Sequence, residues 1–293
     1  MELSIILVNY NDRRHVEECL LSLQKAASAI EHEIIVVDND SEDGSREFVV
    51  RAFPAIRLIV NSENTGFSRA NNLGVRESRG EFVLFLNTDT VVPPGAIRGL
   101  LDHLKFEASA GAAGPALLDG RNFFQVSFGR RVNFFAQFWQ KLILNPYYKR
   151  VLKKSEKIRR VGWLSAACLL CRRKAFEQAG GFDENFFIYF EDIDLCGRMR
   201  KDGWKLFYVP HIRVFHDGGA TTSRRPAASR LEYRKSQLYF YQKHNSRSSV
   251  RLLRLYIKLN VAFLAARGVF RGEEGAALRQ NYQELLERNE GPR

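Results

Sequence analysis

Short apolar runs alternate with amphipathic segments along the N-terminal third of the chain. Unbroken apolar runs are typical of strands buried on both faces, whereas apolar positions three and four residues apart are typical of helices. The expected strands are 4–8, 33–37, 56–60 and 81–86, and the expected helices are 14–27, 45–52, 67–78 and 93–106. This alternation with short links predicts an α/β fold, a Rossmann-like, mostly parallel sheet flanked by helices.

Polar clusters stand where three of these strands end, at residues 9–12, 38–43 and 87–89. Ligands of parallel sheets bind beyond the carboxyl ends of the strands. A turn is naturally polar, so one cluster alone carries little information. Three clusters with carboxylates on the same rim indicate a binding site.

The pattern is less regular in the second half of the chain. Residues 121–160 mix many aromatic side chains with Arg and Lys, and we interpret them as an insert. It can be a lid, an acceptor-binding segment or a membrane-facing surface, or equally an amphipathic segment packed on the core. Strand patterns return at 163–171 and at 205–209.

Two adjacent carboxylates, Glu191 and Asp192, follow an aromatic run at an expected helix start. Burial raises the pKa of a carboxyl group and a helix N-terminus lowers it, so such a position can be tuned for proton transfer. The helical positions that share a line with Asp192 are apolar: Leu195, Cys196 and Met199. Asp192 is therefore expected on the buried side of the helix.

A purely structural interpretation of these acids is also open. Asp192 can cap the helix N-terminus with its side chain. Asp194 lies four residues before Arg198, the spacing of an exposed ion pair on a helix. The structural interpretation fits Asp194 well and Asp192 poorly, because only Asp192 shares the apolar line.

Residues 224–293 are expected to form a basic, helical C-terminal extension. Apolar side chains at helical spacing are interleaved there with Arg251, Arg254, Lys258 and Arg267. The apolar positions are Leu252, Leu255, Tyr256, Leu259, Phe263 and Ala266. A basic amphipathic helix can lie on an anionic membrane surface, which we favour, or pack on its own domain or on another subunit of an oligomer.

The chain has 293 residues and a net charge of +12, which points to an anionic partner. Candidates are a nucleotide-type substrate, an acidic lipid surface and nucleic acid. No zinc-finger spacing or aromatic sheet motif is present, so we expect no nucleic acid partner. The size suits one large domain with an extension.

The four cysteines and the apolar runs indicate the cellular compartment of the protein. Cys168 and Cys171 form a C-x-x-C pair inside an apolar run, with no second pair and no neighbouring His. This favours reduced core thiols in a cytoplasmic protein over a zinc site. The apolar run at 3–8 is too short for a signal peptide. The sequence contains no stretch of about 18 uncharged apolar residues, so we expect no transmembrane helix.

Five segments in a fixed order resemble family 2 inverting glycosyltransferases, which have the nucleotide-sugar-binding GT-A fold. They are SIILVNYN, VVDNDSEDGS, NTGFSRANNLG, LNTDTVVPP and GGFDENFFIYFEDIDLCGRMRKDGW, with HDGGAT following. The resemblance is greatest to the bacterial rhamnosyltransferase-like branch and extends from Leu3 to about Thr222. It implies a GT-A catalytic domain over 1–223.

The resemblance implies a nucleotide site at the ends of the first strands. Residues expected around the nucleoside are Val8, Asn9, Tyr10, Asp38 and Asn39, with Asp40 nearby and Arg69 as a polar contact. Asp38 can also simply cap its turn. The family's Asp-x-Asp motif is similar to Asn87-Thr88-Asp89, which has one carboxylate fewer.

The resemblance also implies a divalent ion, Mn²⁺ or Mg²⁺, held by Asp89 and by His216. Asn87 would then hydrogen-bond the sugar or ribose. Asp192 resembles the family's catalytic base, which takes the proton of the acceptor hydroxyl, while Glu191 orients the acceptor or the base. Trp163 precedes the strand that lines the acceptor pocket in the family.

The implied function is transfer of a sugar, with L-rhamnose from dTDP-rhamnose expected, to a cell-surface glycan or its lipid-linked precursor. We expect the protein on the cytoplasmic face of the inner membrane. A nucleotidyltransferase is an alternative, but the segment after the first strand lacks the Gly-rich phosphate loop of that class. An inactive membrane-bound scaffold is another, although a scaffold has no need of Asp89, Asp192 and His216.

Overall fold

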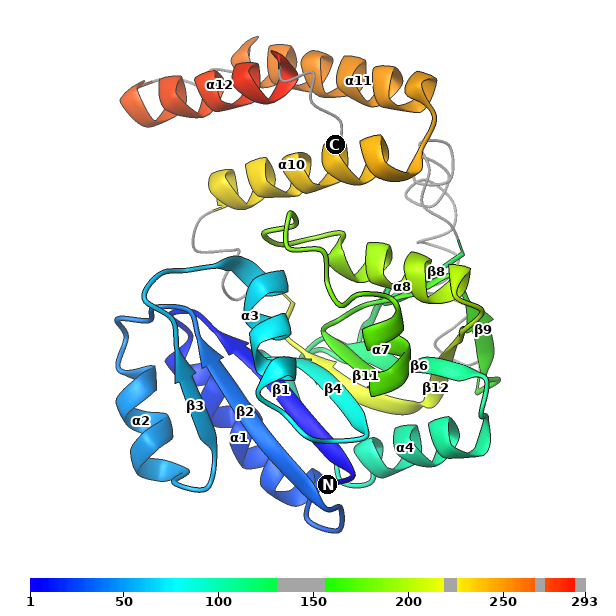
Figure 1. Ribbon diagram of the computed structural model, residues 1–293. Helices are drawn as coiled ribbons and strands as arrows, with labels where there is room; N and C mark the ends of the chain where they lie inside the picture. Colours follow the sequence, from blue (N-terminus) through cyan, green and yellow to red (C-terminus); the bar gives the residue numbers. More distant parts are fainter. Residues whose placement is uncertain (131–155, 219–225, 267–271, 288–293) are drawn as a thin grey trace.

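The computed structural model describes residues 1–130, 156–218, 226–266 and 272–287. A ten-stranded, mostly parallel sheet forms its centre, with helices on both faces and three further helices beyond one end (Figure 1). Most of the predicted insert at 121–160 lies outside the described residues. The predicted α/β fold is confirmed.

The strand order places the first half of the chain beside the second. It is β3 (Arg57–Val60), β2 (His32–Asp38), β1 (Leu3–Asn9), β4 (Phe82–Asn87), β11 (Cys168–Arg172), β6 (Ala110–Leu118), β12 (Lys205–His216) and β5 (Thr90–Val91). The strands from β3 to β4 are parallel, and β12 is parallel to β6. The central strand β11 runs antiparallel to both of its neighbours.

Short strands complete the sheet and correct two expectations. β7 (Phe124–Gln125) pairs with β6, and β9 (Arg159–Val161) pairs with β12. The predicted strand at 163–171 is two strands, because β10 (Trp163–Leu164) leaves the main sheet to pair with β8 (Phe128–Gly129). The strand predicted at 205–209 is the twelve-residue β12, which continues to His216.

Helices cover the two faces because the strands bury both of their sides. On β1, Leu3, Ile5 and Leu7 belong to one apolar cluster, and Ile6 to the other. The first cluster includes side chains of α1 (Arg13–Ala26), α2 (Ser45–Ala52) and α4 (Ala96–Phe106). The second includes side chains of α3 (Gly66–Arg76), α7 (Arg173–Gln178) and α8 (Glu191–Lys201).

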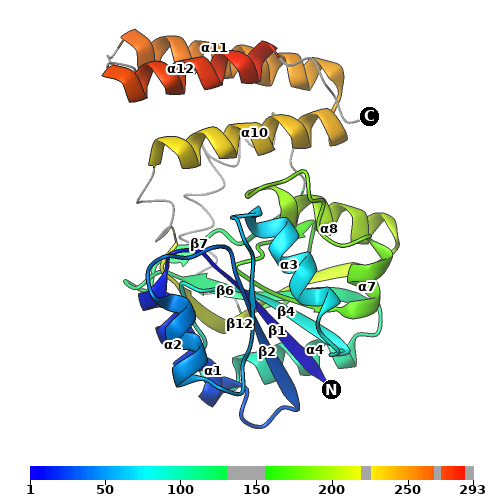
Figure 2. The same ribbon diagram turned by 60° about the vertical axis from the view of Figure 1, so that its left-hand side comes forward.

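The C-terminal extension consists of α10 (Pro226–His244), α11 (Arg247–Ala266) and α12 (Gly272–Glu287). Helix α10 lies between the α/β part and the outer pair α11 and α12 (Figures 1 and 2). A third apolar cluster joins Phe186 and Phe190 to side chains of all three helices, among them Phe240, Leu253 and Tyr282. The extension therefore packs directly on the segment that precedes the predicted catalytic acids.

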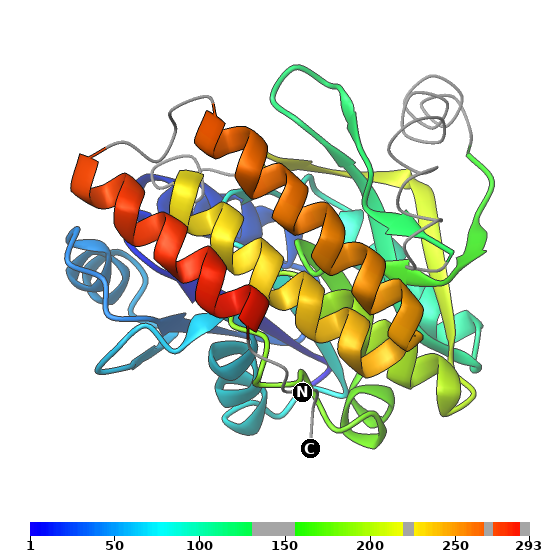
Figure 3. The same ribbon diagram turned by 90° about the horizontal axis from the view of Figure 1, so that it is seen from above.

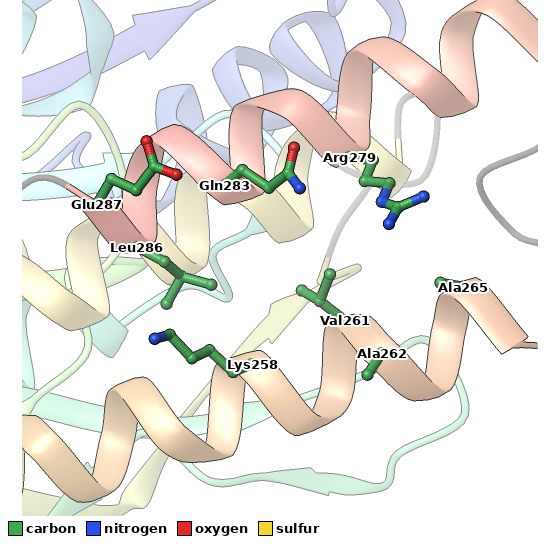
Figure 4. A pocket seen from close by; sticks show the side chains of 8 residues that line it. All are labelled: Lys258, Val261, Ala262, Ala265, Arg279, Gln283, Leu286 and Glu287. Atoms are coloured by element: carbon green, nitrogen blue, oxygen red, sulfur yellow. The ribbon is translucent and has the colours of Figure 1, made fainter.

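The apolar side chains of α11 divide between two sides of the helix. Leu253 and Ile257 are buried against the other helices. The apolar positions predicted from the sequence lie on the outer side instead, where Leu255 is 53% exposed and Leu259 is 62% exposed. Figure 3 shows α11 lying across the outer side of the molecule. Between α11 and α12 a cavity of about 300 Å³ is lined by Val261, Leu286 and the stems of longer side chains (Figure 4). In the described part of the chain, no helix combines the length and apolar character needed to cross a membrane.

Candidate active site at the carboxyl ends of the strands

The register of the sheet brings the ends of three strands together. Asn9 of β1 lies opposite Asp38 of β2, and Val8 lies opposite Asn87 of β4. The three polar clusters predicted at strand ends therefore share one rim. Two residues of this rim, Asn11 and Asp40, have positive φ values of 50° and 67°, which Asn and Asp tolerate better than most residues.

Asp38 and its neighbours form a buried hydrogen-bond network. One carboxylate oxygen of Asp38 accepts hydrogen bonds from the Nε of Arg46 at 2.7 Å and from the backbone N–H of Ser41, and the other accepts from the side chain of Asn9 at 2.8 Å. Arg46 also pairs with Asp40 at 2.8 Å. Asp38 thus holds the turn together, and Arg46 is a site residue that the sequence interpretation missed.

The remaining predicted nucleotide contacts differ in exposure. Asn39 is buried and accepts hydrogen bonds from Asn61 and Thr65. Thr88 is buried too, and its hydroxyl lies 3.4 Å from a carboxylate oxygen of Asp12. Val8 and Tyr10 are half-buried, and Arg69 on α3 is exposed and faces Glu184 at 3.6 Å. Within this set, Tyr10, Asp40 and Arg69 retain the most access to an incoming ligand.

The structure brings the two predicted metal ligands together. The Nε2 of His216 lies 3.3 Å from an oxygen of Asp89 and 3.3 Å from the side-chain nitrogen of Asn87. The Nδ1 of His216 lies 2.7 Å from Oε1 of Gln125, whose amide nitrogen donates to the backbone oxygen of His216. Because an amide oxygen only accepts, this hydrogen bond places a proton on Nδ1, so in the neutral ring Nε2 is the nitrogen that could bind a cation.

The ligand set is small. In the ranges that the structure describes, no cluster of three or more His, Cys, Asp and Glu side chains is arranged to hold a metal ion. Asp89 and His216 would supply one hard oxygen donor and one imidazole nitrogen, a combination that suits Mn²⁺. Gln125, which orients the imidazole, was not predicted, since its importance depends on the pairing of β7 with β6.

Glu191 and Asp192 occupy the first turn of α8. Asp192 is partly buried and accepts hydrogen bonds from the backbone N–H groups of Ala166 at 3.1 Å and of Ile193 at 2.7 Å. Glu191 is 6% exposed, and one of its carboxylate oxygens is buried with no hydrogen-bond partner among the described residues. Asp192 does not cap the helix, because the N-cap position belongs to Phe190.

Burial changes the proton affinity of both acids. Desolvation raises the pKa of Asp192 to about 6, although the hydrogen bonds from Ala166 and Ile193 oppose the change. Desolvation and the adjacent Asp192 carboxylate raise the pKa of Glu191 well above its usual range. A carboxylate that titrates near neutral pH has the proton affinity that a general base requires.

A short backbone segment links Asp192 to the Asn-x-Asp turn. Ala166 donates to Asp192, and the next residue, Ala167, accepts a hydrogen bond from the backbone N–H of Asn87 at 3.0 Å. The predicted base and the predicted metal-binding turn therefore lie on opposite sides of one strand connection. The arrangement thus brings the predicted base and the predicted metal-binding turn to the same rim of the sheet.

The backbone before α8 is held in an unusual conformation. Tyr189 and Phe190 have positive φ values of 72° and 68°, although neither is Gly, Asn or Asp. Such conformations cost about 1–3 kcal/mol each and persist where surrounding contacts impose them. Here the contacts come from the third apolar cluster, which buries Phe186 and Phe190 against the C-terminal helices.

Gly66 fixes the same segment from the other side, which yields a testable prediction. A Cβ atom at Gly66 would lie 2.6 Å from the backbone oxygen of Phe187, and the φ of Gly66 is 83°. Gly66→Ala is therefore expected to displace residues 182–190 and lower transfer at least tenfold while the protein stays folded. Gly120→Ala is the control, because no described residue lies within 4 Å of a Cβ atom at that position. Equal rates for both variants would contradict the role of Gly66.

Asp194 corrects the sequence interpretation. It was expected in an exposed ion pair with Arg198, but it is completely buried. One oxygen lies 2.7 Å from Arg198, and the other lies 2.8 Å from Lys243 and 2.5 Å from His244, both on α10. The sequence spacing identified Arg198, whereas the cationic partners on α10 are about fifty residues away in the chain and only the fold brings them close.

Trp163, the predicted acceptor contact, lies on the neighbouring strand β10. It is half-buried, and its indole nitrogen is buried without a hydrogen-bond partner in the part of the chain described. Leu164 beside it packs against α8, where its N–H lies 3.4 Å from the Sγ of Cys196. Trp163 thus lies near the helix that carries Asp192.

Comparison with known proteins shows the family to which the chain is similar. Residues 4–180 match the family described as Glycosyl transferase family 2. An N-acetylglucosaminyl-diphospho-decaprenol L-rhamnosyltransferase of Mycobacterium tuberculosis is 34% identical over 83% of this chain and 85% of its own length. The rhamnosyltransferase WbbL of Escherichia coli is 25% identical over 72% of this chain and 82% of its own length.

Solved structures share the fold. The mannosyltransferase PcManGT of Pyrobaculum calidifontis, in complex with GDP-Man and Mn²⁺, superimposes with a TM-score of 0.60 at 18% identity, covering 97% of this chain and 80% of that one. GalNAc-T7 with UDP, GalNAc and Mn²⁺ gives a TM-score of 0.59 at 17% identity over 82% of this chain and 50% of that one. The chain therefore belongs to glycosyl transferase family 2 and is a glycosyltransferase with the GT-A fold, similar to rhamnosyltransferases.

Proposed function

We propose that this enzyme transfers L-rhamnose from dTDP-rhamnose, with inversion and with the help of a divalent ion, to a sugar carried on a lipid diphosphate. The observation that carries the proposal is the placement of Asp192 beside the rim that holds Asp89 and His216. The names of the mycobacterial and Escherichia coli relatives support the choice of sugar, and the former supports the acceptor.

The proposed reaction is a direct displacement. The acceptor hydroxyl oxygen forms a bond to the anomeric carbon, while the bond from that carbon to the diphosphate oxygen breaks. Asp192 takes the hydroxyl proton, and the nucleoside diphosphate leaves with the bonding electron pair. Asp89 and His216 would hold an ion that neutralises the charge gathering on the diphosphate, whose oxygens would complete the ligand set.

Transfer assays with purified protein test this function. Nucleotide sugars that differ in base and sugar are incubated with Mn²⁺ or Mg²⁺ and with N-acetylglucosamine linked through diphosphate to an alkyl chain. We expect transfer from dTDP-rhamnose, loss of transfer with EDTA, and recovery on adding the ion back. No transfer and no donor hydrolysis across the panel would reject the proposal.

We also propose that the outer side of α11 lies on an anionic membrane surface. Leu252, Leu255 and Leu259 are all exposed there, and the exposed cations Arg251 and Lys258 flank them. Apolar side chains enter the acyl boundary of a bilayer while cations meet anionic headgroups, so this charge pattern matches such a surface. An enzyme held on the membrane by α11 would also be close to a lipid-linked acceptor.

Vesicle sedimentation checks the membrane proposal. Leu255→Ser combined with Leu259→Ser is expected to weaken binding to phosphatidylglycerol vesicles at least tenfold, since two half-exposed leucines lose about 2 kcal/mol of apolar burial. Phe106→Ser is the control, because Phe106 is 90% exposed at the end of α4. Unchanged vesicle binding together with a smaller particle mass for the double variant would instead identify α11 as a subunit contact.

A further inference from the structure

A second pocket, of about 440 Å³, lies along α8 on the side that faces α10 and the β8–β10 pair. Its wall includes Ile193, Gly197, Arg200 and Lys201 of α8, which succeed one another at helical spacing. Trp163 and Phe240 add aromatic surfaces, and Arg130 and His244 close the rim. Of the residues that line it, only Trp163 has a predicted role in transfer, as an acceptor contact.

The lining of the pocket is cationic. Arg130, Arg200 and Lys201 are exposed, no Asp or Glu of the described residues lines the pocket, and none of these three cations forms an ion pair within the described ranges. His244, in contrast, is bonded to Asp194. Unpaired cations around a concave surface attract an anion, and Arg binds phosphate through paired hydrogen bonds.

Stabilisation of the helix dipole explains only part of this positive charge. Cations near a helix C-terminus stabilise the helix dipole, and Arg200 and Lys201 lie in the last turn of α8. Arg130 follows β8 and belongs to no helix, yet it lines the same pocket. The convergence of cations from two separate elements therefore requires a further reason.

The position of the pocket along α8 relative to Asp192 limits the kind of ligand that can reach both. Ile193 lines the pocket and directly follows Asp192, whereas Lys201 lies about 12 Å further along the helix axis, at the rise of an α-helix. An acceptor whose hydroxyl reaches Asp192 can therefore extend past Trp163 and place a more distant anionic group among the cations. The chemical class that fits is an organic phosphate joined to a sugar.

We propose that this pocket binds the phosphate or diphosphate of the acceptor, with Arg130, Arg200 and Lys201 as its ligands and Trp163 beside the sugar. The proposal rests on the glycosyl transfer proposed above and names the part of the acceptor that the enzyme recognises. It predicts that binding of the acceptor, and not of the donor, depends on these cations.

The test compares two acceptors in the full-length protein with its divalent ion. One is N-acetylglucosamine linked through diphosphate to a short alkyl chain, and the other is the neutral alkyl glycoside. Arg200→Ala combined with Lys201→Ala is expected to raise KM for the diphosphate acceptor about tenfold or more, with kcat at saturation, donor hydrolysis and KM for the neutral acceptor unchanged. Arg51→Ala combined with Lys174→Ala is the control, since both residues are exposed on other helices and the net charge changes equally.

Several outcomes would overturn the proposal. One is an equal rise in KM for both acceptors, and another is a loss of donor hydrolysis. Either result would indicate a general disturbance of the site. A third is weaker binding to phosphatidylglycerol vesicles with unchanged KM for the soluble acceptor, which would assign the pocket to a lipid headgroup. If no transfer is found, calorimetry with the diphosphate analogue still decides, because the variant must bind it about tenfold more weakly than wild type.

Discussion

Asp192→Asn is expected to lower kcat/KM for transfer by about 10²–10⁴-fold, the usual contribution of a positioned general base. An amide cannot take the proton of the acceptor hydroxyl, whereas the donor site at the strand ends is untouched, so the affinity for nucleotide should change little. Steady-state kinetics with calorimetry of dTDP binding measures both. Substantial residual turnover would reject Asp192 as the base.

The pH dependence provides an independent check of the same residue. Burial raises the pKa of Asp192 to about 6, and only the deprotonated form can act as a base. Activity should therefore fall as the pH drops through about 6 and be nearly constant above it, and the residual activity of Asp192→Asn should lack this step. In the folded state the raised pKa favours the protonated form, so this group lowers stability as the pH rises from about 4 to 6.

Two controls separate chemistry from structural damage. Asp192 accepts hydrogen bonds from two backbone N–H groups, whereas Asn offers only one side-chain acceptor oxygen, so the thermal midpoint of the variant should be measured alongside its activity. Glu191→Gln is the matched comparison. Because burial favours the neutral form of Glu191, its amide should cost less activity than Asp192→Asn. The reverse order would assign the base to Glu191.

Asp194→Asn is expected to destabilise the protein by about 3 kcal/mol or more. Removing one partner of a buried ionic cluster leaves the others uncompensated, which usually costs about 3–5 kcal/mol. Here Arg198, Lys243 and His244 would lose the carboxylate that joins α8 to α10. Urea unfolding followed by circular dichroism measures the change.

Asp202→Asn is the control for this prediction, because Asp202 is exposed at the end of the same helix and its change should stay within about 0.5 kcal/mol. Burial by itself would raise the pKa of Asp194, but His244, Arg198 and Lys243 together lower it to about 2. A depressed pKa stabilises the fold above the unfolded value of about 4 and no longer does so once the pH falls through about 2. The difference between wild type and Asp194→Asn should therefore shrink between pH 5 and 2, and a constant difference would contradict the ionic explanation.

The contacts between α8 and α10 that stabilise the protein also hold the segment that carries the predicted catalytic acids. The predicted catalytic acids begin α8. Phe186 and Phe190 before them are buried by the C-terminal helices, and Asp194 after them is bonded to α10. The C-terminal extension thus supports the segment that carries the predicted catalytic acids. Tyr189 and Phe190, which have positive φ values, both pack in the apolar cluster that this extension completes.

The sequence predicted some elements well because their signals are local. The strands of the first half follow from unbroken runs of Val, Ile and Leu, and α2 was placed at its observed bounds. By contrast β6, in the middle of the sheet, was not predicted. Its sequence AGAAGPALL has no β-branched or aromatic residue, and only its complete burial between β11 and β12 makes it a strand.

For the site, the sequence by itself predicted which residues carry chemistry. Asp89, Asp192 and His216 were identified from motif order, and the polar ends of β1, β2 and β4 from strand periodicity. Tertiary structure alone decided what surrounds them: Gln125 orients His216, Arg46 binds Asp38, and Lys243 meets Asp194.

The orientation of α11 was decided in the same way. Its helical period is local, but the choice of Leu253 and Ile257 as the packed side depends on α10 and α12. The physical reason is common to these cases. Periodicity and turn chemistry act over a few residues, whereas burial, ion pairing and pKa depend on groups that folding brings together from distant parts of the chain.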